Sequence, residues 1–222
     1  MKNILLLIFA ISFVSTAKAA PLAAIMTFES MTLTTDGVRK QTQFQERFIR
    51  DNNMIWSERI LPSTVQQHRH DEANEQEHHH DLNFATAGKW ISRNANNQVN
   101  FAFVREHEKK IIQPRNSEYG MLGFNGEWET AYYLVDRSVL KKMTATKKGT
   151  TDATQWYEKK DATQLTRVLW DERKEIPLSI ETSRLDGTMS NKITLVITAA
   201  PAVLPWNNLQ TYQTQAYEDL LD

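Results

Sequence analysis

The sequence predicts a mainly β protein (α+β), an antiparallel meander with one or two helices packed across it. Three observations support this fold class. Segments in which apolar and polar residues alternate recur along the chain. Turn signals such as Asp36-Gly37 and Asp186-Gly187 separate several of them. Helical periodicity is confined to two stretches, 130–143 and the C-terminal segment.

The first strands are predicted at 25–34, 38–50 and 54–61. Asp36-Gly37 joins the first two as a hairpin, and Pro62 ends the third. The alternation in 38–50 leaves one face polar, so we expect a meander with one wet face and one face packed inward.

The middle of the chain predicts strands at 89–93, 98–105 and 110–113. The second has apolar residues on both faces, so we expect it to be covered on both sides. A glycine-containing loop at 117–128 follows, without the Gly-Lys-Ser/Thr ending of a phosphate loop. A helix is then predicted within 130–143, capped by Asp136.

The last third predicts a polar loop at 144–154 and then four strands. These strands are expected at 155–159, 164–170, 177–183 and 188–198. We expect the chain to end in a helix that starts at Pro205 and packs on the sheet through one apolar stripe. The stripe consists of Trp206, Leu209, Tyr212, Ala216, Leu220 and Leu221.

Residues 1–19 have the pattern of a secretory signal peptide. Lys2 gives the positive start, residues 4–14 the apolar core, and Ala17-Lys18-Ala19 a small-x-small cleavage site. We expect residues 20–222 to form a single exported, soluble β-rich domain without a transmembrane segment. In a Gram-negative cell its location is the periplasm.

Charge and cysteine content exclude several classes of protein. The chain has 26 basic and 27 acidic residues, and loss of Lys2 and Lys18 with the leader leaves 24 against 27. No basic patch dominates, so nucleic-acid binding has no electrostatic support. The chain has no cysteine, which excludes disulfides and thiolate metal sites.

A histidine-rich insertion at 66–81 is the strongest candidate site. Imidazole and carboxylate groups bind Zn(II), Cu(II) or Ni(II). If the segment is extended, the histidines at 68 and 70, and those at 78 and 80, share a side. If it is helical, Asp71, Glu75 and His79 share a face. The predicted metal ligands are His68, His70, His78, His79, His80, Asp71 and Asp81. The alternative is a solvated low-complexity loop.

Several short motifs resemble the LolA-like superfamily of outer-membrane lipoprotein carriers and lipoprotein-sorting proteins. They are VLWD at 168–171, IPL at 176–178, Asp186-Gly187, ITL at 193–195, and the IWSER strand at 55–59. The resemblance implies a curved antiparallel half-barrel sheet with helices plugging one face. It also implies a cavity that binds or senses lipid or acyl chains. The histidine-rich insertion is outside this pattern, and no family site residues are carried over.

Two functions follow. The first is a non-enzymatic exported binding protein that holds a lipid, a lipoprotein-like apolar ligand or a segment of a periplasmic protein partner in a LolA-like half-barrel. We expect the inner face of the half-barrel to be rich in aromatic residues. The alternative is that these residues simply fill the core. They are Phe28, Phe44, Phe48, Trp56, Phe101, Phe103 and Trp170. The alternative is a periplasmic metal-handling protein. A metal-dependent hydrolase is disfavoured, because no H-E-x-x-H pattern occurs.

Overall fold

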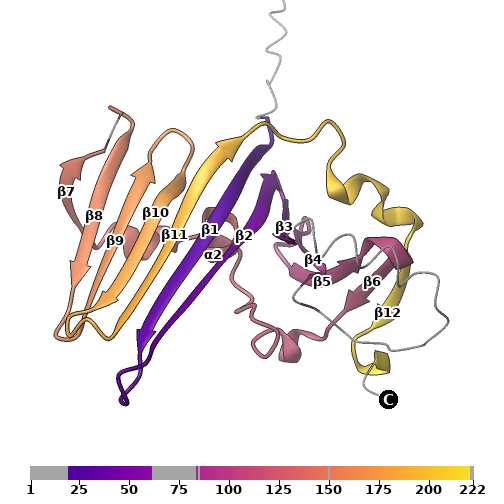
Figure 1. Ribbon diagram of the computed structural model, residues 1–222. Helices are drawn as coiled ribbons and strands as arrows, with labels where there is room; N and C mark the ends of the chain where they lie inside the picture. Colours follow the sequence, from indigo (N-terminus) through magenta and orange to yellow (C-terminus); the bar gives the residue numbers. More distant parts are fainter. Residues whose placement is uncertain (1–19, 62–83, 85, 150, 221–222) are drawn as a thin grey trace, which may run out of the picture.

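The computed structural model describes residues 20–61, 84, 86–149 and 151–220. Within them, one twelve-stranded sheet has the order β12-β6-β5-β4-β3-β2-β1-β11-β10-β9-β8-β7 (Figure 1). The strands are β1 (Leu22–Leu33), β2 (Arg39–Asp51), β3 (Met54–Ile60), β4 (Gly88–Arg93), β5 (Val99–Arg105), β6 (Lys110–Gln113), β7 (Thr144–Lys148), β8 (Thr154–Lys160), β9 (Gln164–Asp171), β10 (Ile176–Arg184), β11 (Met189–Thr198) and β12 (Gln213–Ala216). The curved sheet stays unclosed, because β7 and β12 are its edges. This confirms the predicted mainly β half-barrel class.

Strand β1 lies in the middle of the sheet, between β2 and β11. It pairs with both in antiparallel register over most of its length. The predicted hairpin at Asp36-Gly37 is confirmed, and Gly37 has a φ of 81° that favours glycine. Every neighbouring pair is antiparallel except β12 with β6, which is parallel.

The two faces of the sheet carry different elements. We call the face that packs against helices α2 (Trp128–Tyr133) and α3 (Arg137–Leu140) the helix face. It includes Ala24 and Phe48. The opposite face packs against the 3-10 helix η4 (Pro205–Thr211) and includes Ala23 and Ile49. β1 and β2 therefore carry core side chains on both of their faces, and both faces of these central strands are packed.

The helical segment predicted within 130–143 is two short helices instead of one. Leu134 has a left-handed φ of 60° and ends α2. Asp136 caps α3 as predicted, because its Oδ1 accepts a hydrogen bond from Ser138 N at 2.7 Å. Trp128 and Leu140 are the buried anchors of the two helices.

The predicted C-terminal helix is wrong. Pro205 does begin a helix, but it is η4, and the chain then forms β12 and the short 3-10 helix η5 (Glu218–Leu220). Trp206, Leu209 and Tyr212 pack on the sheet as expected. The backbone after Thr211 pairs with β6 and satisfies the hydrogen-bonding groups of that edge. This tertiary pairing outweighs the weak helix preference of its Gln- and Thr-rich sequence.

The polar stretch 144–154, predicted as a loop, contains the edge strand β7. It pairs with β8 through an irregular register. Gly149 follows it at a crowded point, because a Cβ there would lie 2.1 Å from Thr154 Oγ1. The predicted signal peptide at 1–19 and the predicted insertion at 66–81 lie outside the described residues. No helix in the described part of the chain is long and apolar enough to cross a membrane.

Candidate functional site

One cross-strand row on the helix face is apolar across six adjacent strands. Consecutive members are register partners on β8, β9, β10, β11, β1 and β2: Tyr157, Val168, Ile180, Ile193, Phe28 and Phe44. We call this row the apolar ladder. Val168 is buried and the other five side chains are half-buried. With about 4.8 Å between strands, the ladder is about 24 Å long.

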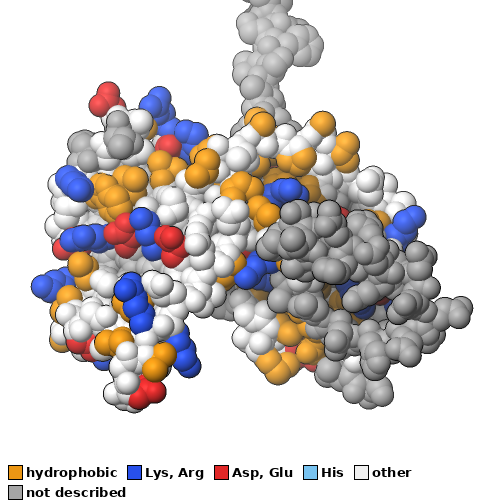
Figure 2. Space-filling view, viewed as in Figure 1, with side chains coloured by type: hydrophobic (Ala, Val, Ile, Leu, Met, Phe, Trp, Pro, Cys, Tyr) orange, Lys and Arg blue, Asp and Glu red, His pale blue; other side chains and the backbone are white. Residues whose placement is uncertain are grey.

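Polar rows border the ladder on one edge and on the other side of the sheet. The next row on the helix face is polar. It is uncharged from β9 to β2, with Thr166, Thr182, Asn191, Ser30 and Thr42, and its member on β8 is the exposed Lys159. On the opposite face of the same strands, a row alternates in charge: Glu158, Arg167, Glu181, Lys192 and Glu29. Red and blue side chains alternate over these strands in Figure 2. The strands are therefore wet on one face and apolar on the other.

The ladder ends in an aromatic pair at β1 and β2. The Phe28 and Phe44 rings stack with centroids 4.6 Å apart and an interplanar angle of 12°. The guanidinium of Arg59 lies 3.5 Å from the centroid of Phe44. Among the described residues, Arg59 makes no ion pair. This end of the ladder therefore combines an apolar surface with a positive charge.

A cleft of about 860 Å³ opens at the other end of the ladder. Tyr157 is both the last ladder residue and part of its lining, together with Trp170 from β9. Helices α2 and α3 contribute Trp128 and Leu140, both buried. Arg93, from β4, also lines it and lies 4.5 Å from the Trp128 ring centroid. Because β4 and β8 are far apart in the sheet, the sheet must curve around α2.

Charged groups at the rim of the cleft are held in defined pairs. Arg137 contacts Glu129 on α2 at 3.0 Å and Glu175, in the β9–β10 turn, at 2.9 Å. The Tyr157 hydroxyl donates a hydrogen bond of 2.7 Å to Glu172. Two causes raise the pKa of Tyr157 to about 12. The larger is burial, and the second is this hydrogen bond to a carboxylate. The phenol therefore stays protonated and neutral at physiological pH.

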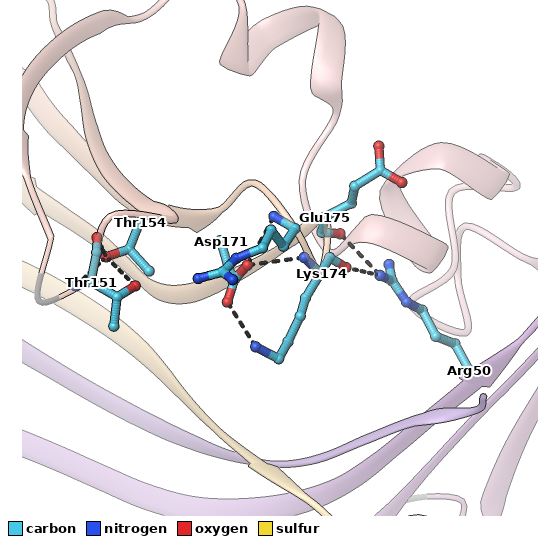
Figure 3. A network of polar contacts seen from close by, with 7 residues as sticks. Arg50, Thr151, Thr154, Asp171, Lys174 and Glu175 are labelled. Carbon is cyan, nitrogen blue, oxygen red and sulfur yellow. Dashed lines mark hydrogen bonds and ion pairs between the residues drawn. The ribbon is translucent and has the colours of Figure 1, made fainter. Parts of the chain in front are cut away.

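Arg50 connects strand β2 by hydrogen bonds to α2 and to the β9–β10 turn, two segments that line the cleft (Figure 3). Its side chain is buried, and Nη2 donates to the carbonyl oxygens of Lys174 at 2.6 Å and Glu175 at 3.1 Å. Nη1 donates to the carbonyl oxygen of Tyr132 at 2.6 Å. Burial lowers the pKa of Arg50 from its usual value, and the nearby tyrosines oppose the shift. Asp171 organises the same turn by accepting from the Lys174 backbone N–H at 2.9 Å.

The structure divides the predicted aromatic inner face into three groups. Phe48, Phe101, Phe103 and Trp170 are buried core residues on the helix face. The prediction that Trp56 belongs to the same inner face is wrong, because Trp56 packs in the core of the opposite face. Only Phe28 and Phe44 of the seven remain half-buried. The sequence analysis did not assign Trp128 or Tyr157 to the lining of a cleft. For Tyr157, the alternation of apolar and polar residues within 155–159 was the available signal.

The predicted metal ligands cannot be placed with this site. His68, His70, His78, His79, His80, Asp71 and Asp81 lie outside the described residues. The remaining histidine, His107, is exposed in the 3-10 helix η2 (Glu106–Glu108). Within the described ranges, no group of three or more histidine, aspartate or glutamate side chains is placed to hold a metal ion.

Comparison with known proteins gives structural likenesses alone. No family model matches the sequence, and no curated protein matches it. An uncharacterised conserved protein from Thermus thermophilus has a TM-score of 0.38 at 8% identity, over 87% of this chain and 90% of that one. A putative outer membrane lipoprotein-sorting protein domain from Vibrio parahaemolyticus has a TM-score of 0.35 at 9% identity, over 85% and 89%.

A DUF1329 family protein from Desulfovibrio piger is also similar, with a TM-score of 0.35 at 7% identity, over 83% of this chain and 87% of that one. The Vibrio domain carries the name of the class that the sequence motifs resemble. These likenesses concern the fold.

Proposed function

We propose that this chain is a non-enzymatic binding protein that holds an elongated apolar ligand along the helix face. The observation that carries the proposal is the apolar ladder, with five half-buried side chains in register across neighbouring strands. Half-buried apolar side chains gain about 25 cal/mol for each Å² that a ligand removes from water. A continuous row of them favours one long ligand over several small ones.

The two ends of the ladder favour an amphiphile. At one end the cleft offers Trp128, Trp170 and Leu140 to an apolar group. At the other end Arg59 lies over Phe44 and can pair with an anionic head group. The bordering row of hydroxyl and amide side chains keeps the ligand on the ladder, because an acyl chain there would leave polar groups unpaired. A fatty acid has this combination of chemistry.

The side chains of the cleft suit holding a ligand better than transforming one. Arg137 is engaged by Glu129 and Glu175, and Glu172 is engaged by Tyr157. Asp136 caps α3. The charged groups of the rim thus stabilise the helices, and we propose no reaction. The leader at 1–19 supports export to the periplasm as part of the same proposal.

The test is binding of a fluorescent fatty-acid analogue to the delipidated chain from residue 20. We expect saturable binding by the natural sequence. The double variant F28S/F44S should weaken it about tenfold or more, since each phenylalanine gives up apolar contact worth roughly 1.5–3 kcal/mol when fully buried. The matched control is Val196→Ser, which changes an exposed apolar residue of β11 on the opposite face.

Two results would count against the proposal. One is absence of binding by the delipidated natural sequence. The other is equal affinity in F28S/F44S and V196S. If the analogue fails but an apolar peptide binds and is lost in F28S/F44S, the ladder holds a segment of a protein partner and the fatty-acid assignment is wrong.

A further inference from the structure

A second cavity, of about 550 Å³, lies on the opposite face of the sheet from the apolar ladder. Strands β4, β5, β6 and β12 form its floor, and η4 with the residues after it forms its roof. Its volume is within the range of small-molecule sites, roughly 300–1,000 Å³. It shares no lining residue with the cleft at the end of the ladder.

The floor of this cavity is built by register. Ser92 is the partner of Asn100, and Trp90 is the partner of Ala102. The small side chain of Ala102 leaves the space that the cavity occupies. Leu209 is buried against this face and anchors η4 above it. The floor and the roof of the cavity therefore both come from well-packed elements, and the cavity is preformed.

The lining has an unusual chemistry, aromatic and polar without charge. Its aromatic residues are the half-buried Trp90, Trp206 and Tyr212 and the buried core residue Phe101. The polar ones are Ser92, Asn100, Gln113, Gln210 and Thr214. None of the described residues that line the cavity carries a charge. By contrast, eight charged side chains line the cleft: Arg93, Glu127, Glu129, Asp136, Arg137, Lys141, Glu172 and Glu175.

The polar side chains of this cavity are not used by the fold. Among the described residues, the amides of Asn100, Gln113 and Gln210 make no side-chain hydrogen bond to one another or to any other group. Trp90 donates to Met54 Sδ at 3.4 Å, a weak acceptor. Donors and acceptors that the protein leaves unpaired beside aromatic faces are available to a ligand.

Three classes of ligand can be compared with this lining. A charged ligand would be desolvated without a counter-charge from the described lining residues, which is unfavourable. An acyl chain would leave three amides unpaired. A sugar has apolar C–H faces that stack on aromatic rings and hydroxyl groups that pair with amide and hydroxyl side chains. The lining fits the third class.

We propose that this cavity binds an uncharged polyhydroxylated ligand, a short saccharide. Trp206 and Tyr212 supply the stacking surface from the roof. Asn100, Gln113 and Gln210 supply hydrogen bonds from both walls. The site is independent of the apolar ladder, so either proposal can fail without the other.

The experiment titrates the chain from residue 20 with maltose, cellobiose, lactose and diacetylchitobiose, and follows binding by tryptophan fluorescence and saturation-transfer NMR. We expect saturable millimolar or tighter binding of at least one disaccharide. Because none of the described residues that line the cavity is charged, the affinity for the disaccharide should not change between low and high salt. F28S/F44S should leave it unchanged.

The variants Gln113→Ala and Gln210→Ala test the assignment without disturbing the fold, because both side chains are exposed and unpaired within the described structure. Each should weaken binding about fivefold, and the pair more, since each removes one ligand hydrogen bond. Asn207→Ala is the matched control, an exposed amide of η4 outside the lining. Melting temperatures should stay the same in all three.

Failure of all four disaccharides at millimolar concentration would overturn the proposal. So would binding that Q113A/Q210A leaves intact, or that N207A weakens equally. Displacement of a bound disaccharide by a fatty acid, with loss of both in Q113A/Q210A, would show that the cavity takes apolar chains and that the saccharide assignment is wrong.

Discussion

Arg50 on β2 donates a hydrogen bond of 2.6 Å to the carbonyl oxygen of Tyr132, 82 positions later in the chain. That carbonyl belongs to the last turn of α2, where a cation also opposes the negative end of the helix dipole. The same guanidinium bonds to the turn that precedes β10. One buried side chain therefore joins the central strands to two walls of the cleft.

Replacing Arg50 with methionine is expected to lower the free energy of unfolding by about 3 kcal/mol. Three carbonyl oxygens lose a buried donor, and each lost partner costs about 1 kcal/mol or more. Urea denaturation measures the loss. Arg39→Met is the control, an exposed arginine at the other end of β2, with an expected change within about 0.5 kcal/mol. Equal destabilisation by both changes would contradict a special role for Arg50.

The raised pKa of Tyr157 predicts a loss of stability at high pH. Its pKa is about 12 in the folded chain against 10.0 for an ordinary phenol. The folded state holds this proton more tightly, so the contribution is present below pH 10 and is lost as the pH rises toward about 12. Between these pH values the natural sequence should lose more unfolding free energy than Tyr157→Phe.

A spectroscopic measurement separates this tyrosine from the others. The difference in phenolate absorbance between the natural sequence and Y157F should titrate near pH 12. In Glu172→Gln the same difference should move toward lower pH, because the charge that opposes ionisation is gone. A difference titration at the ordinary value in both proteins would refute the contact between Tyr157 and Glu172.

Gly149→Ala is expected to destabilise the β7–β8 edge by about 2 kcal/mol, as overpacking does. An added Cβ would lie 2.1 Å from Thr154 Oγ1 and 2.8 Å from Leu169 Cδ1. Thr154 cannot move aside freely, because its hydroxyl donates to Thr151 O at 2.9 Å. Gly120→Ala, where nothing lies within 4 Å of the new Cβ, is the control in the same thermal denaturation series.

Metal binding by the insertion at 66–81 stays a prediction. Calorimetric titration of Zn(II), Cu(II) and Ni(II) into the chain without an added tag should give stoichiometric binding. The binding should disappear below about pH 6.5, where imidazole is protonated. A variant with alanine at the five histidines should lose it; they are His68, His70, His78, His79 and His80. Unchanged affinity in that variant would identify the insertion as a solvated loop.

Local signals in the sequence located most strands. The strand predicted at 188–198 is β11 (Met189–Thr198), and the turn at Asp186-Gly187 has the expected left-handed Gly187 with a φ of 74°. Those signals succeed because alternation and turn chemistry act within a few residues. They failed for β7 and β12, whose extended backbone depends on pairing with a neighbouring strand.

Most of the candidate site could not be predicted from the sequence, for a related reason. The ladder exists because Phe28 on β1 pairs with Ile193 on β11 and with Phe44 on β2. A shift of one residue in either register would turn these side chains to the wet face. The pairing of β1 with β11 joins distant parts of the chain, so alternation alone cannot set it. Trp56 was assigned to the wrong face because alternation within one strand does not say which side meets the helices.

The position of β1 also determines when the sheet can form. β1 is the first of the described strands and lies in the middle of the sheet, and nine described strands separate it along the chain from its partner β11. A growing chain can make the β1–β2 hairpin early, but half of its central pairing waits until residue 198 has been made. Pairing between such distant segments is slow, because a long loop must close first. The central pairing of the sheet is therefore complete only after the whole segment from Leu22 to Thr198 has been synthesised.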